Sequence, residues 1–283
     1  MDDAKFFIVG ANGQLGTALK KKYPNAQSAD VGELDITNKD SVLYYDWSNI
    51  EVILNAAAFT NVDGAETDEG RIAAWKVNAT AVGYLSEVAR QEDITLIHIS
   101  SDYVFDGTQA NHSENEDLSP LSVYGASKAA GDLLVQATPK HYLLRTSWVI
   151  GEGNNFVRTM LGLGAKGINP SVVNDQIGRL TFTDELVKAI DHLLSSKAEY
   201  GLYNISNDGE PASWADIARE IFKLAGYANS VTGVTTEKYY EGKNNIALRP
   251  LQSSLDLSKI TATGYTPTDW KQELENYIKE EQK

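Results

Sequence analysis

The segment "FFIVGANGQLG" (residues 6–16) joins a short apolar run to three glycines spaced three residues apart. Glycine inside a helix or strand costs roughly 1 kcal/mol relative to alanine, so such a cluster needs a physical reason. Between a strand and a helix, bare backbone can approach a phosphate, and the free N–H groups and dipole of the helix attract the anion. Random placement of 22 glycines gives this spacing about 0.13 times, so the spacing alone leaves a flexible turn as the alternative. Because the context fits a phosphate site, we predict one that includes Gly10 and Gly13.

Apolar, strand-like runs alternate with helical patterns through the first half of the chain. The strand-like segments are residues 5–9, 52–58, 94–100 and 141–149, and longer amphipathic stretches separate them. This alternation predicts βαβ units and a parallel sheet covered on both faces. After residue 151 the rhythm becomes irregular. We therefore predict an α/β protein with a Rossmann-like, doubly wound parallel sheet in a dinucleotide-binding domain (1–150). A smaller C-terminal substrate-binding lobe (151–283) follows, and the chain crosses between the two.

The composition restricts the class of partner. The 283-residue chain has 42% hydrophobic residues and a net charge of −14, from 39 acidic and 25 basic side chains. Nucleic acid and anionic membranes need a basic surface, which argues against both as the main partner. There is no cysteine, and therefore neither a disulfide nor a thiolate metal site. No run approaches the roughly 20 apolar residues of a membrane helix, and the N-terminus lacks a signal-peptide core, so we expect a cytoplasmic protein.

Asp30 lies about 20 residues beyond the start of the glycine loop, where a carboxylate of a dinucleotide fold bonds the adenosine ribose. A plain turn residue beside Gly32 is the alternative. No basic residue lies next to Asp30 to meet a 2′-phosphate, and the G-x-x-G-x-x-G spacing differs from the commoner G-x-G-x-x-G. The sequence therefore leaves both NADH and NADPH open as the cofactor.

An enzyme that transfers hydride to a ketone also needs an acid for the developing alkoxide. The segment "YGASK" supplies Tyr124 and Lys128, four residues apart on one face of a helix, where an ammonium lowers the pKa of a phenol. About one such pair arises by chance in a chain with 14 tyrosines, and Tyr239 and Lys243 in "YYEGK" form a second. Only Tyr124 follows a predicted strand, whose end carries "SSDYVF", and ligands bind at that edge of a sheet. We therefore predict Tyr124 and Lys128 as the functional pair.

Taken in order, "GANGQLG", "NAAA", "KVNATAVGYL", "ISSDYVF" and "YGASK" resemble the extended short-chain dehydrogenase/reductase family. The later segments "RTSWV", "NDQ" and "LRPLQSSLD" narrow the resemblance to the branch that reduces a 4-dehydro sugar nucleotide in rhamnose synthesis. The resemblance implies that NADH or NADPH gives hydride to the C4 ketone of dTDP-4-dehydro-L-rhamnose. The product would be dTDP-L-rhamnose, a precursor of cell-surface polysaccharide.

The resemblance also assigns roles to individual residues. Ser101, Tyr124 and Lys128 would form the catalytic set. Asn78 would support a water relay to the lysine, and a purely structural buried amide is the alternative. The residues expected at the cofactor, besides Tyr124 and Lys128, are Gly10, Gly13, Gln14, Leu15, Asp30, Asp35, Ile36, Ala58, Phe59 and Thr60.

The substrate is expected to contact Ser101, Asp102, Trp148, Asn154, Asn155 and Arg249. An ordinary core position is the alternative for Trp148. Because the diphosphate approaches a protein of net charge −14, its affinity must come from local donors. Arg249 is the best candidate, since its fork can bind a diphosphate bidentately, and a surface ion pair is the alternative. Asn154 and Asn155, at a predicted helix start, would add donors.

Three positions depart from the pattern of that branch. Ser101 stands where threonine is common, and its hydroxyl keeps the role. Leu180 replaces a usual proline, which puts the local shape of the substrate loop in question. Ala18 stands where some members carry a glutamate that binds magnesium at a dimer interface. We therefore expect no bound metal, and a monomer or weak homodimer.

Other functions share this fold. A 4-epimerase or another sugar-nucleotide reductase of the family would carry the same residues. A dehydratase needs a glutamate where this chain has Tyr103, and a phenol is a poor substitute at neutral pH. A non-catalytic regulatory subunit would have no need of Ser101, Tyr124 and Lys128 together.

Overall fold

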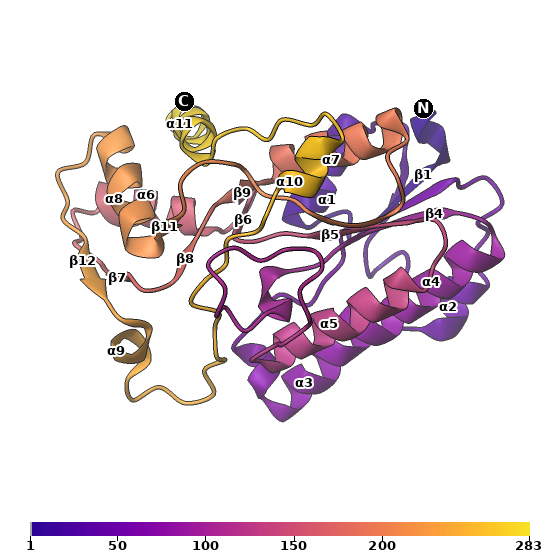
Figure 1. Cartoon of the computed structure of the whole chain (residues 1–283), viewed down its shortest axis with the longest axis horizontal. Helices are drawn as coiled ribbons and strands as arrows, with labels where there is room; N and C mark the ends of the chain where they lie inside the picture. Colours follow the sequence, from indigo (N-terminus) through magenta and orange to yellow (C-terminus); the bar gives the residue numbers. More distant parts are fainter. Residues whose placement is uncertain (1) are drawn as a thin grey trace.

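A computed structural model describes residues 2–283 and contains a central sheet of six parallel strands (Figure 1). Strand β1 lies between β2 and β3. In this register, Val9 is paired with Ala29 of β2 and with Asn55 of β3. The predicted α/β class with a Rossmann-like parallel sheet is confirmed. In sheet order the strands are β2 (Gln27–Ala29), β1 (Phe6–Val9), β3 (Val52–Asn55), β4 (Thr95–Ile99), β5 (His141–Arg145) and β10 (Gly201–Asn204).

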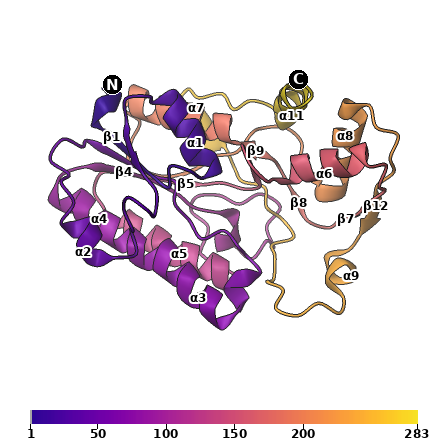
Figure 2. The ribbon, with the colours of Figure 1, turned by 180° about the vertical axis from the view of Figure 1, so that it is seen from behind.

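Helices cover both faces of the sheet, as Figures 1 and 2 show from opposite sides. The four inner strands β1, β3, β4 and β5 are buried on both faces, and their successive side chains alternate between two hydrophobic cores. In β1, Phe6 and Ile8 belong to one core, and Phe7 and Val9 belong to the other. One face carries α1 (Gln14–Lys22), α7 (Thr183–Ser196) and α10 (Ser258–Ala262); the other carries α2 (Lys39–Leu43), α3 (Asp68–Trp75), α4 (Ala81–Gln91) and α5 (Val123–Gln136).

A single π turn, η3 (Lys76–Thr80), joins α3 to α4 without a break in the helical path. Such turns occur often at functional sites, because they shift side chains from the regular helical repeat. Here the turn contains Asn78, which the sequence places at the active site. The short 3-10 turns of the chain are η1 (Asp3–Lys5), η2 (Gly64–Glu66) and η4 (Asp102–Val104).

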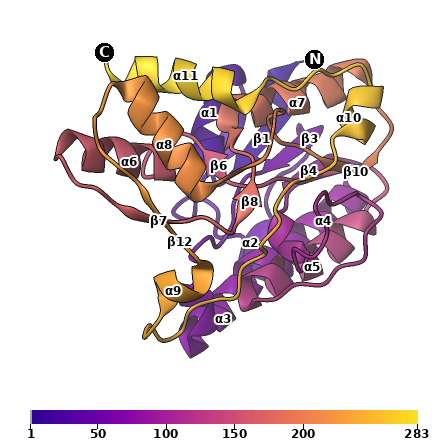
Figure 3. The ribbon, with the colours of Figure 1, turned by 60° about the vertical axis from the view of Figure 1, so that its left-hand side comes forward.

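Figure 3 shows the helices and strands of the smaller lobe, whose side chains form a separate hydrophobic core. Phe222 and Trp270 come from two of its helices, Phe182 comes from β9, and Leu180 precedes that strand. Three two-stranded sheets, β6–β9, β7–β12 and β8–β11, frame this core. The elements are β6 (Val149–Ile150), α6 (Phe156–Ala165), β7 (Ser171–Val173), β8 (Ile177–Gly178), β9 (Thr181–Phe182), β11 (Ala212–Ser213), α8 (Trp214–Ala225), β12 (Thr232–Val234), α9 (Thr236–Tyr240) and α11 (Trp270–Glu281).

The chain passes between the lobes more than once. After α6 and β7–β9 it returns to the large sheet, where α7 packs against α1 and β10 pairs with β5. It then enters the small lobe again through β11 and α8, and α10 packs beside the sheet before α11 completes the small lobe. Residues 183–204, which lie beyond the proposed division at residue 150, therefore complete the sheet and cover one of its faces.

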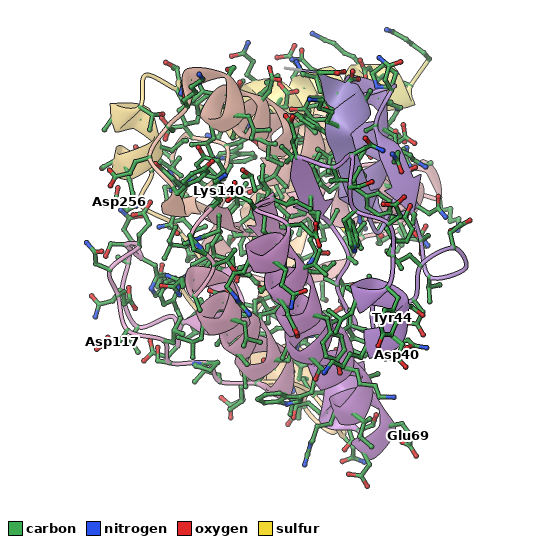
Figure 4. The ribbon with its side chains drawn as sticks, turned by 90° about the vertical axis from the view of Figure 1, so that its right-hand side faces the viewer. Asp40, Tyr44, Glu69, Asp117, Lys140 and Asp256 are labelled. Carbon is green, nitrogen blue, oxygen red and sulfur yellow. The ribbon has the colours of Figure 1, made fainter. Side chains whose placement is uncertain are left out.

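Several charged side chains lie at the surface on the side away from the small lobe. Figure 4 shows Asp40 on α2, Glu69 on α3 and Asp117 in the loop before α5 at the edge of the molecule. Lys140 forms an ion pair with Asp93 on this side, at 2.5 Å. Within residues 2–283, none of the helices is long and apolar enough to cross a membrane.

Candidate active site

Two adjoining hollows lie where β1, β3 and β4 end, at the carboxyl edge of the parallel sheet. This edge is where open α/β sheets bind ligands. The first, referred to below as the cleft, lies between the two lobes, and the second extends from the glycine loop past β2. Of the residues that the sequence predicts, the cleft is lined by Gly13, Gln14, Leu15, Ala58, Thr60, Ser101, Asp102, Tyr124, Lys128, Trp148 and Asn154, and the second hollow by Gly10, Gly13, Asp30, Asp35, Ile36 and Ala58.

The glycine loop is shaped by close backbone contacts. Gly10 has a φ of +75°, and a Cβ there would lie 2.6 Å from the backbone nitrogen of Ala57. A Cβ on Gly16 would lie 2.1 Å from the carbonyl oxygen of Gly10. Gly13 begins α1 without a side-chain cap, so the first N–H groups of that helix remain free to bind an anion. The loop therefore fits the diphosphate of a dinucleotide.

Asp30 connects the end of β2 to the glycine loop. Its carboxylate accepts the backbone N–H of Asn12 at 2.9 Å and that of Val31 at 2.8 Å. Asp35 accepts both the N–H and the hydroxyl of Thr37, at 2.9 and 2.8 Å. The second hollow has no lysine, arginine or histidine among its described lining residues. It fits an adenosine ribose with free hydroxyl groups.

Tyr124 and Lys128 lie one turn apart on α5, whose N-terminus is fixed by Ser122. The Ser122 hydroxyl accepts the N–H of Gly125 at 3.1 Å. Tyr124 is 9% exposed and Lys128 is 1% exposed. Burial raises the pKa of Tyr124 to about 12, and the neighbouring Ser101 hydroxyl opposes the rise. Burial lowers the pKa of Lys128 to about 8, although Asp132 opposes the fall. At neutral pH the pair is therefore a protonated phenol beside an ammonium.

Ser101 and Asp102 follow β4 and face the cleft. The Ser101 hydroxyl donates to Oδ1 of Asp102 at 3.1 Å and accepts the N–H of Tyr103 at 3.2 Å. Burial raises the pKa of Asp102 to about 6, opposed by hydroxyl groups of Ser253 and Ser101.

Several buried polar atoms of the cleft have no hydrogen-bond partner within residues 2–283. They are Gln14 Oε1, Ser100 Oγ, Asp102 Oδ2 and Thr146 Oγ1. Native proteins leave few buried polar atoms unpaired, so this concentration indicates a polar ligand.

Trp148 lines the cleft in a strained backbone conformation. Its φ is +47°, in the left-handed region that tryptophan rarely adopts. The ring stacks on Trp214 of the small lobe, with centroids 3.8 Å apart and planes 20° from parallel. The residue is half-buried at the boundary between the lobes, and not enclosed in a core.

Asn78 holds the backbone that follows β3. Its Oδ1 accepts the N–H of Phe59 at 2.9 Å, and its Nδ2 donates to the Phe59 carbonyl at 3.1 Å and to Ser127 Oγ at 3.0 Å. Both amide hydrogens of Asn78 are thus used within the protein, and they fix the backbone at Phe59 beside the cleft. The ring of Phe59 packs with Tyr124 and Tyr103, outside the lining of the cleft.

Two residues predicted at the diphosphate are engaged elsewhere. The amide of Asn155 caps α6: Oδ1 accepts the N–H of Arg158, and Nδ2 donates to the Gly151 carbonyl and to Tyr277 Oη. Its side chain therefore has no hydrogen free for a ligand, whereas Asn154 lines the cleft. Arg249 is not among the residues that line the cleft.

Arg249 forms an ion pair with Asp63 at 2.8 Å, in which the arginine side chain is 13% exposed and the aspartate side chain is 39% exposed. Its guanidinium also donates to the Ala247 carbonyl at 2.9 Å and lies 4.7 Å from the ring centre of Tyr240. The carboxylate belongs to the large domain, near the loop that follows β3. The pair therefore ties the segment after α9 to that domain.

A set of buried polar residues that is not predicted from the sequence lies behind the catalytic pair. His98 lies in β4 with no exposed surface, and Asp132 follows Lys128 by one turn of α5. Asp132 accepts from Nε of Arg145 at 3.0 Å in a fully buried ion pair. Two signals in the sequence indicate His98 and Asp132. The first is a histidine inside a strand that is buried on both faces, and the second is a carboxylate four residues after the lysine.

Leu180 and Ala18, which depart from the family pattern, occupy ordinary positions in the fold. Leu180 is fully buried in the core of the small lobe, directly before β9. Ala18 lies on α1. Within residues 2–283, no group of three or more histidine, aspartate and glutamate side chains is arranged to hold a metal ion.

The parallel sheet, the glycine loop and the buried hydroxyl–lysine set are those of a nicotinamide-dependent oxidoreductase with an extended short-chain dehydrogenase/reductase fold. Residues 4–283 match the family model described as the RmlD substrate binding domain, and the chain belongs to that family.

Similar proteins cover nearly the whole chain. The dTDP-4-dehydrorhamnose reductase of Aggregatibacter actinomycetemcomitans is 40% identical, over 96% of this chain and 98% of its own. A solved dTDP-4-dehydrorhamnose reductase from Clostridium acetobutylicum is 36% identical with a TM-score of 0.91, and covers 98% of this chain and 99% of its own. The enzyme of that name from Bacillus anthracis, solved with NADP, is 34% identical with a TM-score of 0.89, and covers 97% and 98%.

Proposed function

We propose that the protein uses NADH or NADPH to reduce the C4 ketone of dTDP-4-dehydro-L-rhamnose to dTDP-L-rhamnose. This is the last step of dTDP-rhamnose synthesis. The observation that carries the proposal is the buried Ser101, Tyr124 and Lys128 set beside a glycine loop at the strand ends. Whole-chain relatives at 34–40% identity that are named as this reductase support the substrate.

The dinucleotide supplies the hydride when it is bound. The glycine loop from Gly10 to Gly13 gives the phosphates close access to the backbone, and the first N–H groups of α1, from Gln14 on, bind them. Asp30, Asp35 and Ile36 hold the adenosine. Leu15, Ala58, Thr60 and the backbone of Phe59, which Asn78 fixes, border the remainder.

Tyr124 is the acid of the reaction. With a pKa of about 12 it keeps its proton at neutral pH, and it releases the proton only to a stronger base such as the developing alkoxide at C4. The Ser101 hydroxyl donates to the same oxygen and aligns the ketone. The ammonium of Lys128 stabilises the tyrosinate that remains.

The small lobe and the end of β4 hold the sugar nucleotide. Asp102, Trp148 and Asn154 border the sugar in the cleft. Arg249 binds the diphosphate after its guanidinium has released the carboxylate of Asp63. This exchange is feasible because arginine forms strong, charge-assisted hydrogen bonds with phosphate as well as with carboxylate groups. Asn155 acts indirectly, because its cap on α6 fixes the neighbouring Asn154.

We also propose a cytoplasmic location and a monomer or weak homodimer that needs no metal ion. The acidic composition and the absence of cysteine support the first. Ala18, at the position of the family's magnesium-binding glutamate, supports the second.

The test is a spectrophotometric assay with synthesised dTDP-4-dehydro-L-rhamnose. We expect loss of the reduced-nicotinamide absorbance that depends on both protein and sugar nucleotide, with dTDP-L-rhamnose as product. Parallel assays with NADH and NADPH establish the cofactor preference. Tightly bound NAD in the purified protein, with turnover in the absence of added reductant, would instead identify a 4-epimerase. If neither cofactor is oxidised, the result would favour a non-catalytic regulatory subunit with this fold.

A further inference from the structure

His98 contacts the catalytic lysine from behind, and the reaction described above gives it no role. It lies in β4 between Asn55 of β3 and Lys128 of α5, and none of its surface is exposed. Its Nδ1 is 2.9 Å from Asn55 Nδ2, and its Nε2 is 3.5 Å from Lys128 Nζ. The same Nζ donates to the Ile99 carbonyl at 2.6 Å.

The surroundings of Asn55 determine which nitrogen of His98 carries the hydrogen. The backbone N–H of Ala57 donates to Asn55 Oδ1 at 3.2 Å, which turns the amide so that Nδ2 faces the imidazole. An amide NH2 group can only donate, so Nδ1 of His98 must accept. Burial, followed by the charge of Lys128, holds the pKa of His98 well below its usual range, so the ring is neutral. Its single hydrogen is therefore on Nε2 and points toward Lys128.

We propose that His98 is a positioning residue for Lys128: its Nε2–H stabilises the amine form of the lysine and so eases release of the lysine proton. An N–H dipole directed at an amine lone pair is favourable, whereas the same dipole directed at an ammonium is not. The inference rests on the proposed function, in which Tyr124 loses a proton in each turnover. Lys128 then gives one proton to the tyrosinate, which leaves a neutral amine and a neutral phenol, and water later restores the ammonium.

The other charged groups near Lys128 do not have this effect. Asp132 on α5 favours the ammonium, and Arg145 of β5 pairs with Asp132 and reduces its influence. Tyr124, one turn earlier on α5, is neutral until it has given up its proton. Among the described groups in contact with Nζ, the Ile99 carbonyl accepts a hydrogen, and His98 is the one that presents a hydrogen.

The first test reads the tautomer directly, without substrate. The protein is labelled with ¹⁵N-histidine, and the imidazole nitrogens are followed by NMR from pH 5.5 to 8. The chain has four histidines, and the His98 signals are those lost in His98→Gln. We expect the Nε2–H tautomer with no titration in this range. An Nδ1–H tautomer or a charged ring would overturn the proposal and would leave the proposed function intact.

The second test is the pH profile of kcat. In His98→Leu, loss of the Nε2–H raises the pKa of Lys128, so the basic limb should move upward by about half to one pH unit. The matched control is His141→Leu, since His141 is half-buried at the start of β5 and bonds only to the Thr138 carbonyl. An unmoved limb in His98→Leu would reduce His98 to a packing residue, and a downward shift would mean that it accepts from the ammonium. If the variant does not fold, the tautomer measured in the unmodified protein decides the question.

Discussion

The chain contains two tyrosine–lysine pairs with the same spacing, and their surroundings make them different. Tyr124 and Lys128 are both buried on α5, beside the ends of the parallel strands. Tyr239 is 40% exposed on α9, and that helix ends at Tyr240, before Lys243 is reached. The ammonium of Lys243 consequently lies over the face of the Tyr239 ring, 4.3 Å from its centre.

The difference teaches that spacing alone does not make a proton-transfer pair. A four-residue interval brings two side chains together only while the helix continues through both. Burial then raises the pKa of the phenol and lowers the pKa of the amine. At an exposed site, water solvates the charged forms, and this cause of a shift is absent. The second pair is a surface cation–π contact.

The largest effect should come from Tyr124→Phe. Loss of the proton donor should reduce kcat by about 10²- to 10⁴-fold, while binding of the reduced cofactor changes little, because the ring and its packing are retained. Tyr239→Phe is the matched control and should keep full turnover. The measurement is oxidation of the reduced cofactor, with cofactor affinity from fluorescence titration. Near-normal turnover in Tyr124→Phe would contradict the role of Tyr124 as the proton donor, and the two pairs would then not differ in function.

The next effect concerns the free energy of unfolding. The pKa of Asp102 in the folded protein, about 6, lies above the ordinary 3.8, so the folded state binds the proton more tightly. The stability that this group contributes is complete below about pH 4 and is lost as the pH rises to about 6. Asp102→Asn removes the penalty and should stabilise the fold by about 2–3 kcal/mol at pH 7 and hardly at all at pH 4.

Urea unfolding of wild type and variant between pH 4 and 7 measures this difference. Asp46→Asn is the control, since Asp46 is exposed and Ser48 bonds hold its pKa below the usual range. The control should gain no stability at pH 7. A gain in Asp102→Asn that does not change with pH would point to packing, and not to a buried charge.

A smaller effect is expected from Arg249→Ala. Loss of the diphosphate contact should raise the KM for the sugar nucleotide by about tenfold or more, and the KM for the reduced nicotinamide cofactor much less. Arg219, which pairs with Asp216 on the small lobe, gives the matched control Arg219→Ala. Steady-state kinetics with both substrates distinguish the cases. Equal changes in the two KM values would mean that Arg249 does not bind the diphosphate and serves only as the ion-pair partner of Asp63.

The smallest effect should come from Lys243→Met. An exposed cation–π contact is worth about 0.5–1 kcal/mol, so the unfolding free energy should change by no more than that. Turnover and both KM values should stay within about twofold of wild type. A tenfold loss of turnover would give the second pair a function that its exposure argues against.

Much of this architecture was predictable from local sequence. The glycine loop, the alternation of strands and helices, and the pair on α5 depend on residues close together in the chain, so their patterns survive without knowledge of the fold. The partners of Asn155 and Arg249 were not predictable in this way. Tyr277 and Asp63 lie far from them in sequence, and only the assembled lobes bring each pair together. The π turn that turns Asn78 toward Phe59 likewise leaves no distinct pattern in the residues.

The return of the chain to the sheet at α7 and β10 determines how this molecule can be divided. A fragment ending at residue 150 would lack the outer neighbour of β5, and the row of N–H and C=O groups along that strand would become an open edge. Open edges pair with other chains, so such a fragment should aggregate when expressed alone. The small lobe is therefore built from two separate segments of the chain, and the second of them returns to the large sheet at α10 before α11. Exchanging it between homologues requires transplanting both segments, 151–182 and the residues after 204, in a single step.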